Sequence, residues 1–270
     1  MESRITSALR LTYHPVAVTW ADKEPSDALA FKKGKWGCVM SLFAQAAKGR
    51  IAVFSRETFG CWGGGVGLGF GNQYLNVPGG IDAFYHFLSI GNIRRGSNQK
   101  IKETFCHFLN NHFLDQFMRG ERYLKSPEQV KRFVESLPII DVPSSFVCFK
   151  PLAHVDINKE KPVVVVFVAN PDQLSALVIL ANFGRNNFES VVTPFAAACQ
   201  AIGIIPYREA ESANPRAVVG LIDITARKNV RSVLGNDIFT FAVPLKMFHE
   251  MEEHVEESFL RRDVWKYLSG

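Results

Sequence analysis

One segment restricts the fold of this chain more than any other. Residues 163–168 are an unbroken run of valines and one phenylalanine, which is typical of a strand covered on both faces. Asn170-Pro171-Asp172-Gln173 follows at once and combines an N-cap residue with a proline at the first helical position. Apolar side chains at 174, 177, 178 and 181 then share one helical face. A buried strand that leads directly into a helix predicts a mixed α/β (α+β) fold, with helices flanking a mixed sheet.

Further strand and helix patterns occur on both sides of this segment. The strands are predicted at 15–20, 51–54, 146–150, 218–224 and 238–243, and the helices at 38–47, 81–90, 101–118, 126–137, 195–202 and 245–260. The helix at 101–118 is expected to pack through Phe105, Phe108, Leu109, Leu114 and Phe117. A proline-rich stretch at 138–145 separates these elements, so the chain is interpreted as one domain over 1–270 or as two lobes, 1–140 and 141–270. We find no repeat of 20–50 residues, which excludes solenoids and propellers.

Composition limits the class of protein. The chain has 270 residues, 47% of them hydrophobic, which is enough for a substantial core. Its longest apolar runs are well short of the roughly 18 residues that span a bilayer, and its first residues lack the apolar stretch of a signal peptide. We therefore expect a cytoplasmic protein with no membrane partner. The net charge of +5 is thinly spread, so no nucleic-acid partner is expected either.

The five cysteines are Cys38, Cys61, Cys106, Cys148 and Cys199, and no two of them form a Cys-x-x-Cys pair. In a reducing compartment this pattern argues against a disulfide framework and against a zinc site built from one local segment. Cys106 and Cys148 stand in strongly apolar segments and are expected to be ordinary core residues. Cys38 and Cys199 lie in predicted helices that are rich in small residues, from which both could face a common site.

Cys61 lies in a glycine-rich segment, Gly60-Cys61-Trp62-Gly63-Gly64-Gly65, which continues with glycines at 67, 69 and 71. Glycine permits positive φ and close approach of backbone amides, so the segment is predicted to form a loop that binds an anion. Amides aimed at Cys61 would lower the pKa of its thiol and favour the reactive thiolate. Trp62 could stack on a flat ligand. The alternative is structural: the glycines let the chain cross a crowded surface, and Cys61 fills a small apolar space.

Two polar residues outside this segment are also candidates for the site. His14 precedes the first predicted strand and could reach the site as a ligand, although a surface or capping role is the commoner one. Arg227 follows the predicted strand 218–224, and open α/β sheets place ligand-binding groups at strand ends.

Several of these segments together resemble a known family. His14-Pro15-Val16, Cys61-Trp62-Gly63-Gly64, Asn170-Pro171-Asp172-Gln173 and Gly220-Leu221-Ile222-Asp223 resemble the domain-of-unknown-function 169 family, over nearly the whole chain. The resemblance implies that Cys38, Cys61 and Cys199 belong to the family pattern, and it makes Asn170 a candidate for cofactor binding. Many members carry a paired cysteine motif in the C-terminal third, where this chain has residues 223–227 and no cysteine. This difference weakens any metal-cluster function that needs the pair.

Three functions are compatible with these residues. In the first, which is the leading hypothesis, a metal- or cofactor-binding protein that could be redox-active gathers Cys61 and Cys38, with Cys199 or His14, around an iron–sulfur cluster, zinc or a haem, or holds another cofactor against Trp62 and the glycines Gly63, Gly64 and Gly65. In the second, an enzyme uses Cys61 as its nucleophile, a histidine as base and loop amides as an oxyanion hole. In the third, a non-catalytic module senses an anionic small molecule, with Arg227 as counter-charge. The partner in each is a small-molecule ligand or cofactor, and the 22 phenylalanines are compatible with a homodimer.

Overall fold

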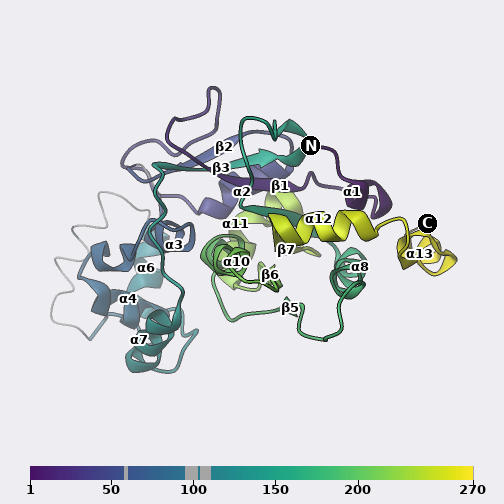
Figure 1. The fold of residues 1–270 in the computed structure, drawn as a ribbon. Helices are drawn as coiled ribbons and strands as arrows, with labels where there is room; N and C mark the ends of the chain where they lie inside the picture. The colour runs from purple at the N-terminus through teal and green to yellow at the C-terminus, as the bar shows by residue number, and fades with distance from the viewer. Residues whose placement is uncertain (58–59, 95–102, 104–110, 270) are drawn as a thin grey trace.

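The structure is a computed structural model that describes residues 1–57, 60–94, 103 and 111–269. Its centre is a seven-stranded mixed sheet with the strand order β2-β3-β1-β4-β7-β6-β5 (Figure 1). Neighbouring strands are antiparallel except for the parallel pair β5 and β6. The predicted fold class is therefore confirmed. The strands are β1 (Val16–Ala21), β2 (Ala52–Ser55), β3 (Phe146–Pro151), β4 (Val164–Ala169), β5 (Val191–Val192), β6 (Ala217–Gly220) and β7 (Phe239–Pro244).

The predicted buried strand, β4, lies at the centre of the sheet between β1 and β7. Val164, Val166 and Val168 project into one hydrophobic core. Val165, Phe167 and Ala169 project into a second core on the opposite face. All six side chains are fully buried, and each valine or phenylalanine gains about 1.5–3 kcal/mol from leaving water. The unbroken apolar run in the sequence is thus explained by helices that cover both faces.

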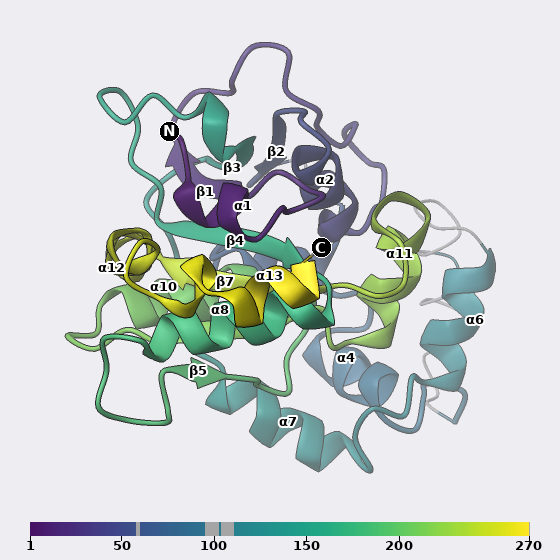
Figure 2. The same ribbon diagram turned by 90° about the vertical axis from the view of Figure 1, so that its right-hand side faces the viewer.

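One face of the sheet is covered by α1 (Arg4–Ala8), α8 (Pro171–Asn182) and α12 (Leu245–His254), with α13 (Asp263–Ser269) beside them (Figure 2). Helix α8 begins as predicted. The side chain of Asn170 accepts the N–H of Gln173 at 2.8 Å, and Gln173 Oε1 accepts the N–H of Asn170 at 3.0 Å. This reciprocal cap satisfies two backbone donors at the start of the helix.

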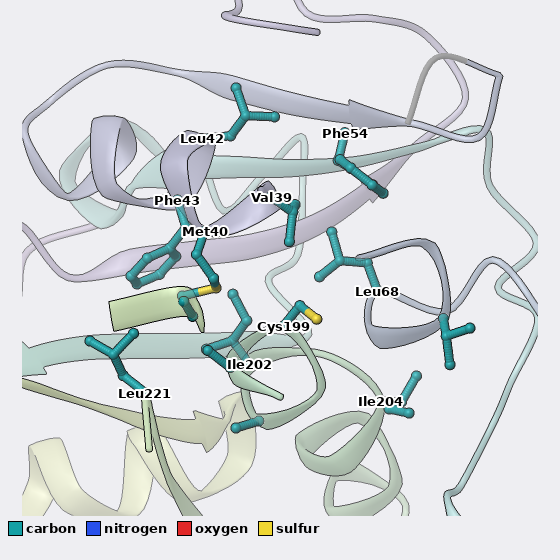
Figure 3. Packing of buried hydrophobic residues seen from close by; sticks show 14 of the residues in the cluster. Val39, Met40, Leu42, Phe43, Phe54, Leu68, Cys199, Ile202, Ile204 and Leu221 are labelled. Atoms are coloured by element: carbon teal, nitrogen blue, oxygen red, sulfur yellow. The ribbon is translucent and has the colours of Figure 1, made fainter. Parts of the chain in front are cut away.

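The opposite face carries the larger group of helices. Helix α2 (Val39–Ala47) packs on β1, β2 and β3, while α9 (Ala198–Ile202) and α10 (Ile204–Ala210) pack on β6 and β7. Helix α3 (Trp62–Gly67) contacts α9, and α11 (Ile224–Leu234) contacts α2. An outer group of α4 (Ile81–Leu88), α6 (Asn111–Arg119) and α7 (Pro127–Ser136) lies at the left of Figure 1. Apolar side chains from these helices fill the larger core, part of which is shown in Figure 3.

The sheet interleaves strands from both sides of the stretch at 138–145. β3 follows this stretch in sequence but lies between β2 and β1, which precede it. Backbone hydrogen bonds of the sheet therefore connect the segments 1–140 and 141–270. Short 3-10 helices, η1 (Gln73–Asn76), η2 (Leu152–His154) and η3 (Phe259–Arg261), complete the structure. In the described parts of the chain, the helices are all too short or too polar to cross a bilayer.

Some predicted elements have different bounds. The strand predicted at 218–224 ends at Gly220, because Leu221 takes a positive φ of 62° and Asp223 begins α11, a helix that the sequence analysis missed. The predicted helix 195–202 begins only at Ala198, and the helix predicted at 245–260 ends at His254. Of the predicted helix 101–118, the structure describes Glu103, which is helical, and the residues of α6. Phe105, Cys106, Phe108 and Leu109 lie outside the described residues.

Candidate functional site

A cavity of about 170 Å³ lies where the N-termini of four helices meet. The N-cap residues of α2, α3, α9 and α11 are Cys38, Cys61, Ala197 and Asp223, and all four line the cavity. Cys199, the second residue of α9, lines it as well. The fold therefore brings three cysteines from distant parts of the sequence to one cavity.

A backbone contact aligns the segments that carry Cys38 and Cys61. The N–H of Gly37 donates to the carbonyl oxygen of Gly60 at 3.3 Å. A Cβ atom at Gly60 would lie 2.6 Å from the Gly37 nitrogen, so no side chain fits there. Because each glycine directly precedes a cysteine, this contact fixes where the two helices begin relative to each other.

The glycine-rich segment forms a helix, not the predicted loop. Trp62–Gly67 is α3, and the Cys61 sulfur caps it by accepting the N–H of Gly64 at 3.4 Å. The loop conformation predicted for Gly63, Gly64 and Gly65 is therefore wrong, since these residues take a helical conformation; ligand binding by them stays a prediction. The N–H groups of Gly63 and Gly64, in the first turn of this helix, point at the Cys61 sulfur.

Close packing explains why this helix is built from glycine. A Cβ atom at Gly64 would lie 3.1 Å from the ring of Phe54, and one at Gly67 would lie 2.7 Å from the sulfur of Cys199. Where α9 meets α10, a Cβ atom at Gly203 would lie 2.0 Å from the carbonyl oxygen of Gly67. Helix α3 thus approaches α9 at backbone distance, which brings Cys199 to the cavity. Figure 3 shows Cys199 between Met40 and Leu68.

Hydrogen bonds join α9 to its neighbours. The thiol of Cys199 donates to the carbonyl oxygen of Gly63 at 3.3 Å. Asp223 Oδ1 accepts the N–H of Ala226 and Oδ2 that of Ala198, each at 2.6 Å. One carboxylate therefore caps α11 and holds the start of α9, and both of its oxygens are used within the protein.

Aromatic rings form most of the remaining wall. Tyr74 stacks on Phe84 with 3.9 Å between ring centroids, and its hydroxyl accepts the side-chain N–H of Gln200 at 3.0 Å. Phe195 is 58% exposed and also lines the cavity, so it lies where the cavity meets solvent. The other aromatic residues of the lining are Trp36, Trp62, Phe87, Phe113, Phe117, Tyr123 and Phe133.

A second carboxylate, that of Glu121, faces the cavity from the segment between α6 and α7. Its Oε1 accepts the hydroxyl of Thr225 at 2.8 Å, and the Thr225 oxygen is itself hydrogen-bonded to Tyr123 at 2.8 Å. Burial raises the pKa of Glu121 from its ordinary 4.5 to about 7, with Asp223 adding to the rise and Thr225 and Lys228 opposing it. Glu121 is therefore partly protonated at neutral pH.

Burial also sets the state of the thiols. It raises the pKa of Cys38 to about 12, and it raises the pKa of Cys61 and that of Cys199 above the ordinary 9. At Cys61 the N–H groups of Gly64 and Gly63 act in the opposite direction but are outweighed. The predicted lowering of the pKa of Cys61 is therefore wrong, and all three thiols are protonated at neutral pH.

Comparison of the sequence with models of known protein families identifies its family. Residues 4–254 match the model of DUF169, described as an uncharacterised ArCR family. The chain belongs to the DUF169 family. No curated protein and no solved structure matches it. The description of the family assigns no reaction, so the function of this DUF169 protein has to be inferred from its cavity.

The cavity of the DUF169 protein includes five of the predicted site residues, Cys38, Cys61, Cys199, Trp62 and Gly63. Gly64 and Gly65 are buried inside α3 behind this wall, and Gly64 contributes through its bond to the Cys61 sulfur.

Three predicted residues lie elsewhere. His14 is exposed, in a surface depression of about 780 Å³ that it shares with the N-terminus. Arg227 donates to the carbonyl oxygens of Leu221, Ile238 and Asn236, so its guanidinium holds the β6–α11 and α11–β7 connections together. Asn170 caps α8 on the opposite face of the sheet.

The metal site predicted from the cysteines gains no support from this geometry. Over residues 1–57, 60–94, 103 and 111–269, no three histidine, cysteine, aspartate or glutamate side chains are grouped to hold a metal ion. The thiols line the cavity together without forming a ligand set.

The sequence analysis did not identify Glu121, Tyr74 or Gln200 as site residues. Asp223 was recognised only within the family resemblance. An Asp followed by the apolar spacing of Ala226, Val230 and Leu234 is an N-cap signal that could have revealed α11 and, with it, this carboxylate.

Proposed function

We propose that this DUF169 protein binds a small, flat and largely apolar organic ligand, as a cofactor or a substrate, with the thiols of Cys38, Cys61 and Cys199 against it. The observation that carries the proposal is one cavity in which three thiols meet a wall of aromatic rings. Ligand sites are typically apolar clefts with a few convergent polar groups, and this cavity has that composition.

The volume limits the size of the ligand. A cavity of about 150 Å³ holds one benzene molecule, whereas drug-sized ligands need roughly 300–1,000 Å³. At about 170 Å³, the cavity of this protein suits one or two fused rings. A dinucleotide or a haem would need a much larger space.

The charges of the lining favour this ligand over an anion. Of the described residues that line the cavity, two are carboxylic acids and none is lysine, arginine or histidine. Arg227, the expected counter-charge for an anion, is engaged elsewhere. A redox role for the three thiols is compatible with this proposal and stays a prediction. The described cysteines are free thiols, which fits the reducing cytoplasm where we place the protein.

The test uses two neutral probes, benzyl alcohol and naphthalen-2-ylmethanol. Binding is measured by thermal shift and by quenching of tryptophan fluorescence, since Trp36 and Trp62 line the cavity. Both probes are expected to raise the melting temperature. Ala197→Leu, which fills the cavity, is expected to abolish this effect, whereas Ala153→Leu at an exposed site preserves it.

If neither probe binds, or if both bind Ala197→Leu as well as they bind the wild type, the proposed site is wrong. Metal analysis of anaerobically purified protein serves as an independent check. If the wild type contains stoichiometric zinc or iron and Cys61→Ala does not, the cavity is a metal centre and the proposal of an organic ligand is wrong.

A further inference from the structure

Glu121 is a carboxylate of the cavity that the described part of the protein engages through only one of its two oxygens. Thr225 donates to Oε1, but within the described part of the chain no donor bonds to Oε2. Asp223, the other carboxylate of the lining, accepts two backbone N–H groups and has no such free oxygen. A ligand in the cavity therefore meets a carboxylate with one oxygen to which no donor of the described residues bonds.

The hydroxyl groups around Glu121 form a chain that ends on this carboxylate. Since Glu121 Oε1 accepts the proton of Thr225, the Tyr123 hydroxyl donates to the Thr225 oxygen. Among the described residues, Asp223 adds negative charge near Glu121, Lys228 opposes it from the surface of α11, and Cys61 and Tyr123 are titratable groups close enough to respond to the charge of Glu121. Lys228 does not line the cavity. The carboxylate of Glu121 therefore lines the cavity without a lysine or arginine beside it among the described lining residues.

The aromatic walls complement a cation. The face of an aromatic ring attracts ammonium and guanidinium groups, most strongly where water is excluded. Tyr74, Phe84 and Trp62 line the same cavity as Glu121. An apolar ring bearing a protonated nitrogen would satisfy both the rings and the unpaired carboxylate oxygen.

Building on the function proposed above, we propose that the ligand carries a protonated nitrogen, as an amine or a basic heterocycle, and that Glu121 is the specificity-determining residue that pairs with it. The neutral ring would occupy the aromatic part of the cavity, and the N–H would donate to Glu121 Oε2. A hydrogen bond between two charged groups is roughly twice as strong as a neutral one, so the nitrogen would decide which flat molecules bind tightly.

The pairing has a defined pH dependence. Glu121 must lose its proton to pair with a cation, and its pKa in the empty cavity is about 7. An aliphatic ammonium, with a pKa of about 10, stays charged below that point. Affinity for a cationic ligand should therefore fall as the pH drops through 7, whereas affinity for a neutral ligand of the same shape should not.

The experiment compares naphthalen-2-ylmethylamine with naphthalen-2-ylmethanol by titration calorimetry, at about pH 8 and at about pH 5.5. With wild type at the higher pH we expect the amine to bind at least about tenfold more tightly, as a charge-assisted hydrogen bond of roughly 1.5–3 kcal/mol implies. That ratio should approach one at the lower pH. Glu121→Gln should bind the alcohol normally but lose the preference for the amine at both pH values. Glu128→Gln, a control on the exposed surface of α7, should behave like wild type.

Each outcome separates the two proposals. If the alcohol binds and the amine has no advantage, or if Glu121→Gln keeps the preference, the inference on Glu121 is overturned while the cavity remains a ligand site. If neither compound binds wild type, both the proposed function and the inference on Glu121 are wrong. Normal binding of the alcohol by Glu121→Gln shows at the same time that this variant is folded.

Discussion

Gly67→Ala tests the close approach of α3 to α9, and Gly63→Ala in the same helix is its control. At Gly67 the new Cβ atom would lie 2.7 Å from the sulfur of Cys199 and 2.9 Å from its Cβ and carbonyl carbon. At Gly63 the nearest atom is the sulfur of Cys61 at 3.7 Å, an ordinary contact. Both substitutions replace a helical glycine and gain a similar propensity of up to about 1 kcal/mol. The difference between the two variants therefore isolates the steric cost at Gly67.

Forcing an extra methyl group into a packed interior costs about 1–3 kcal/mol. Gly67→Ala should be less stable than Gly63→Ala by that amount, and each kcal/mol should lower the melting temperature by about 2–4 °C in a chain of this size. The free energy of unfolding is measured in urea by far-UV circular dichroism and tryptophan fluorescence. Cys199→Ala in the Gly67→Ala background should restore part of the loss, since it removes the sulfur but leaves the backbone carbon in place.

Equal stability of Gly67→Ala and Gly63→Ala would refute this reasoning. It would mean that α3 and α9 do not meet at backbone distance. The position of Cys199 beside the N-terminus of α3, and with it the three-thiol cavity, would then be incorrect.

Two further predictions concern the titrating groups. Iodoacetamide should alkylate Cys38 and Cys61 more slowly at neutral pH in the native protein than in urea, because burial raises the pKa of both thiols. The rates of labelling are measured by peptide mass spectrometry. Faster labelling of Cys61 in the native protein than in urea would restore the hypothesis that Cys61 is a nucleophile. The pKa of Glu121 is higher in the folded protein than the ordinary 4.5 of the unfolded chain. Its contribution to the stability of the folded state is therefore fully present below pH 4.5 and is lost as the pH rises through 7. The free energy of unfolding of Glu121→Gln, measured in urea, should therefore rise by up to about 3 kcal/mol relative to that of wild type between about pH 4 and about pH 8.5. A difference between the two proteins that does not change with pH would contradict the assignment.

The elements that the sequence predicted best are those whose local pattern agrees with their burial. β4 has apolar residues at every position because both of its faces are covered, and α8 has a complete cap at Asn170. Helix α3 was not predictable from propensity, because glycine disfavours helix and only close packing against α9 selects it. Helix α11 was missed because Leu221 and Ile222 extend the apolar run of β6 past the point where the strand ends.

The candidate site was predictable only in part. Cys38, Cys61 and Cys199 were singled out by their small-residue surroundings, and the fold brings them to one cavity. Glu121 carries no local signal, since its environment depends on Thr225, which is 104 residues further along the chain. His14 and Arg227 occupy suitable places in sequence, but one is exposed and the other is bound to backbone carbonyls. Such partners are set by tertiary contacts that no local pattern records.

Two opposing effects decide the chemistry of the cavity. Helix N-termini favour negative charge, and all three cysteines stand at or next to one, which by itself would stabilise thiolates. Removal from water disfavours charge, and for Cys38, Cys61 and Cys199 it is the larger effect. Glu121 starts from a much lower ordinary pKa, so burial raises its pKa only to about 7. Near pH 7 the empty cavity therefore changes charge through Glu121, while its thiols stay neutral, and this is why we assign the proposed selection of ligand charge to the carboxylate rather than to a cysteine.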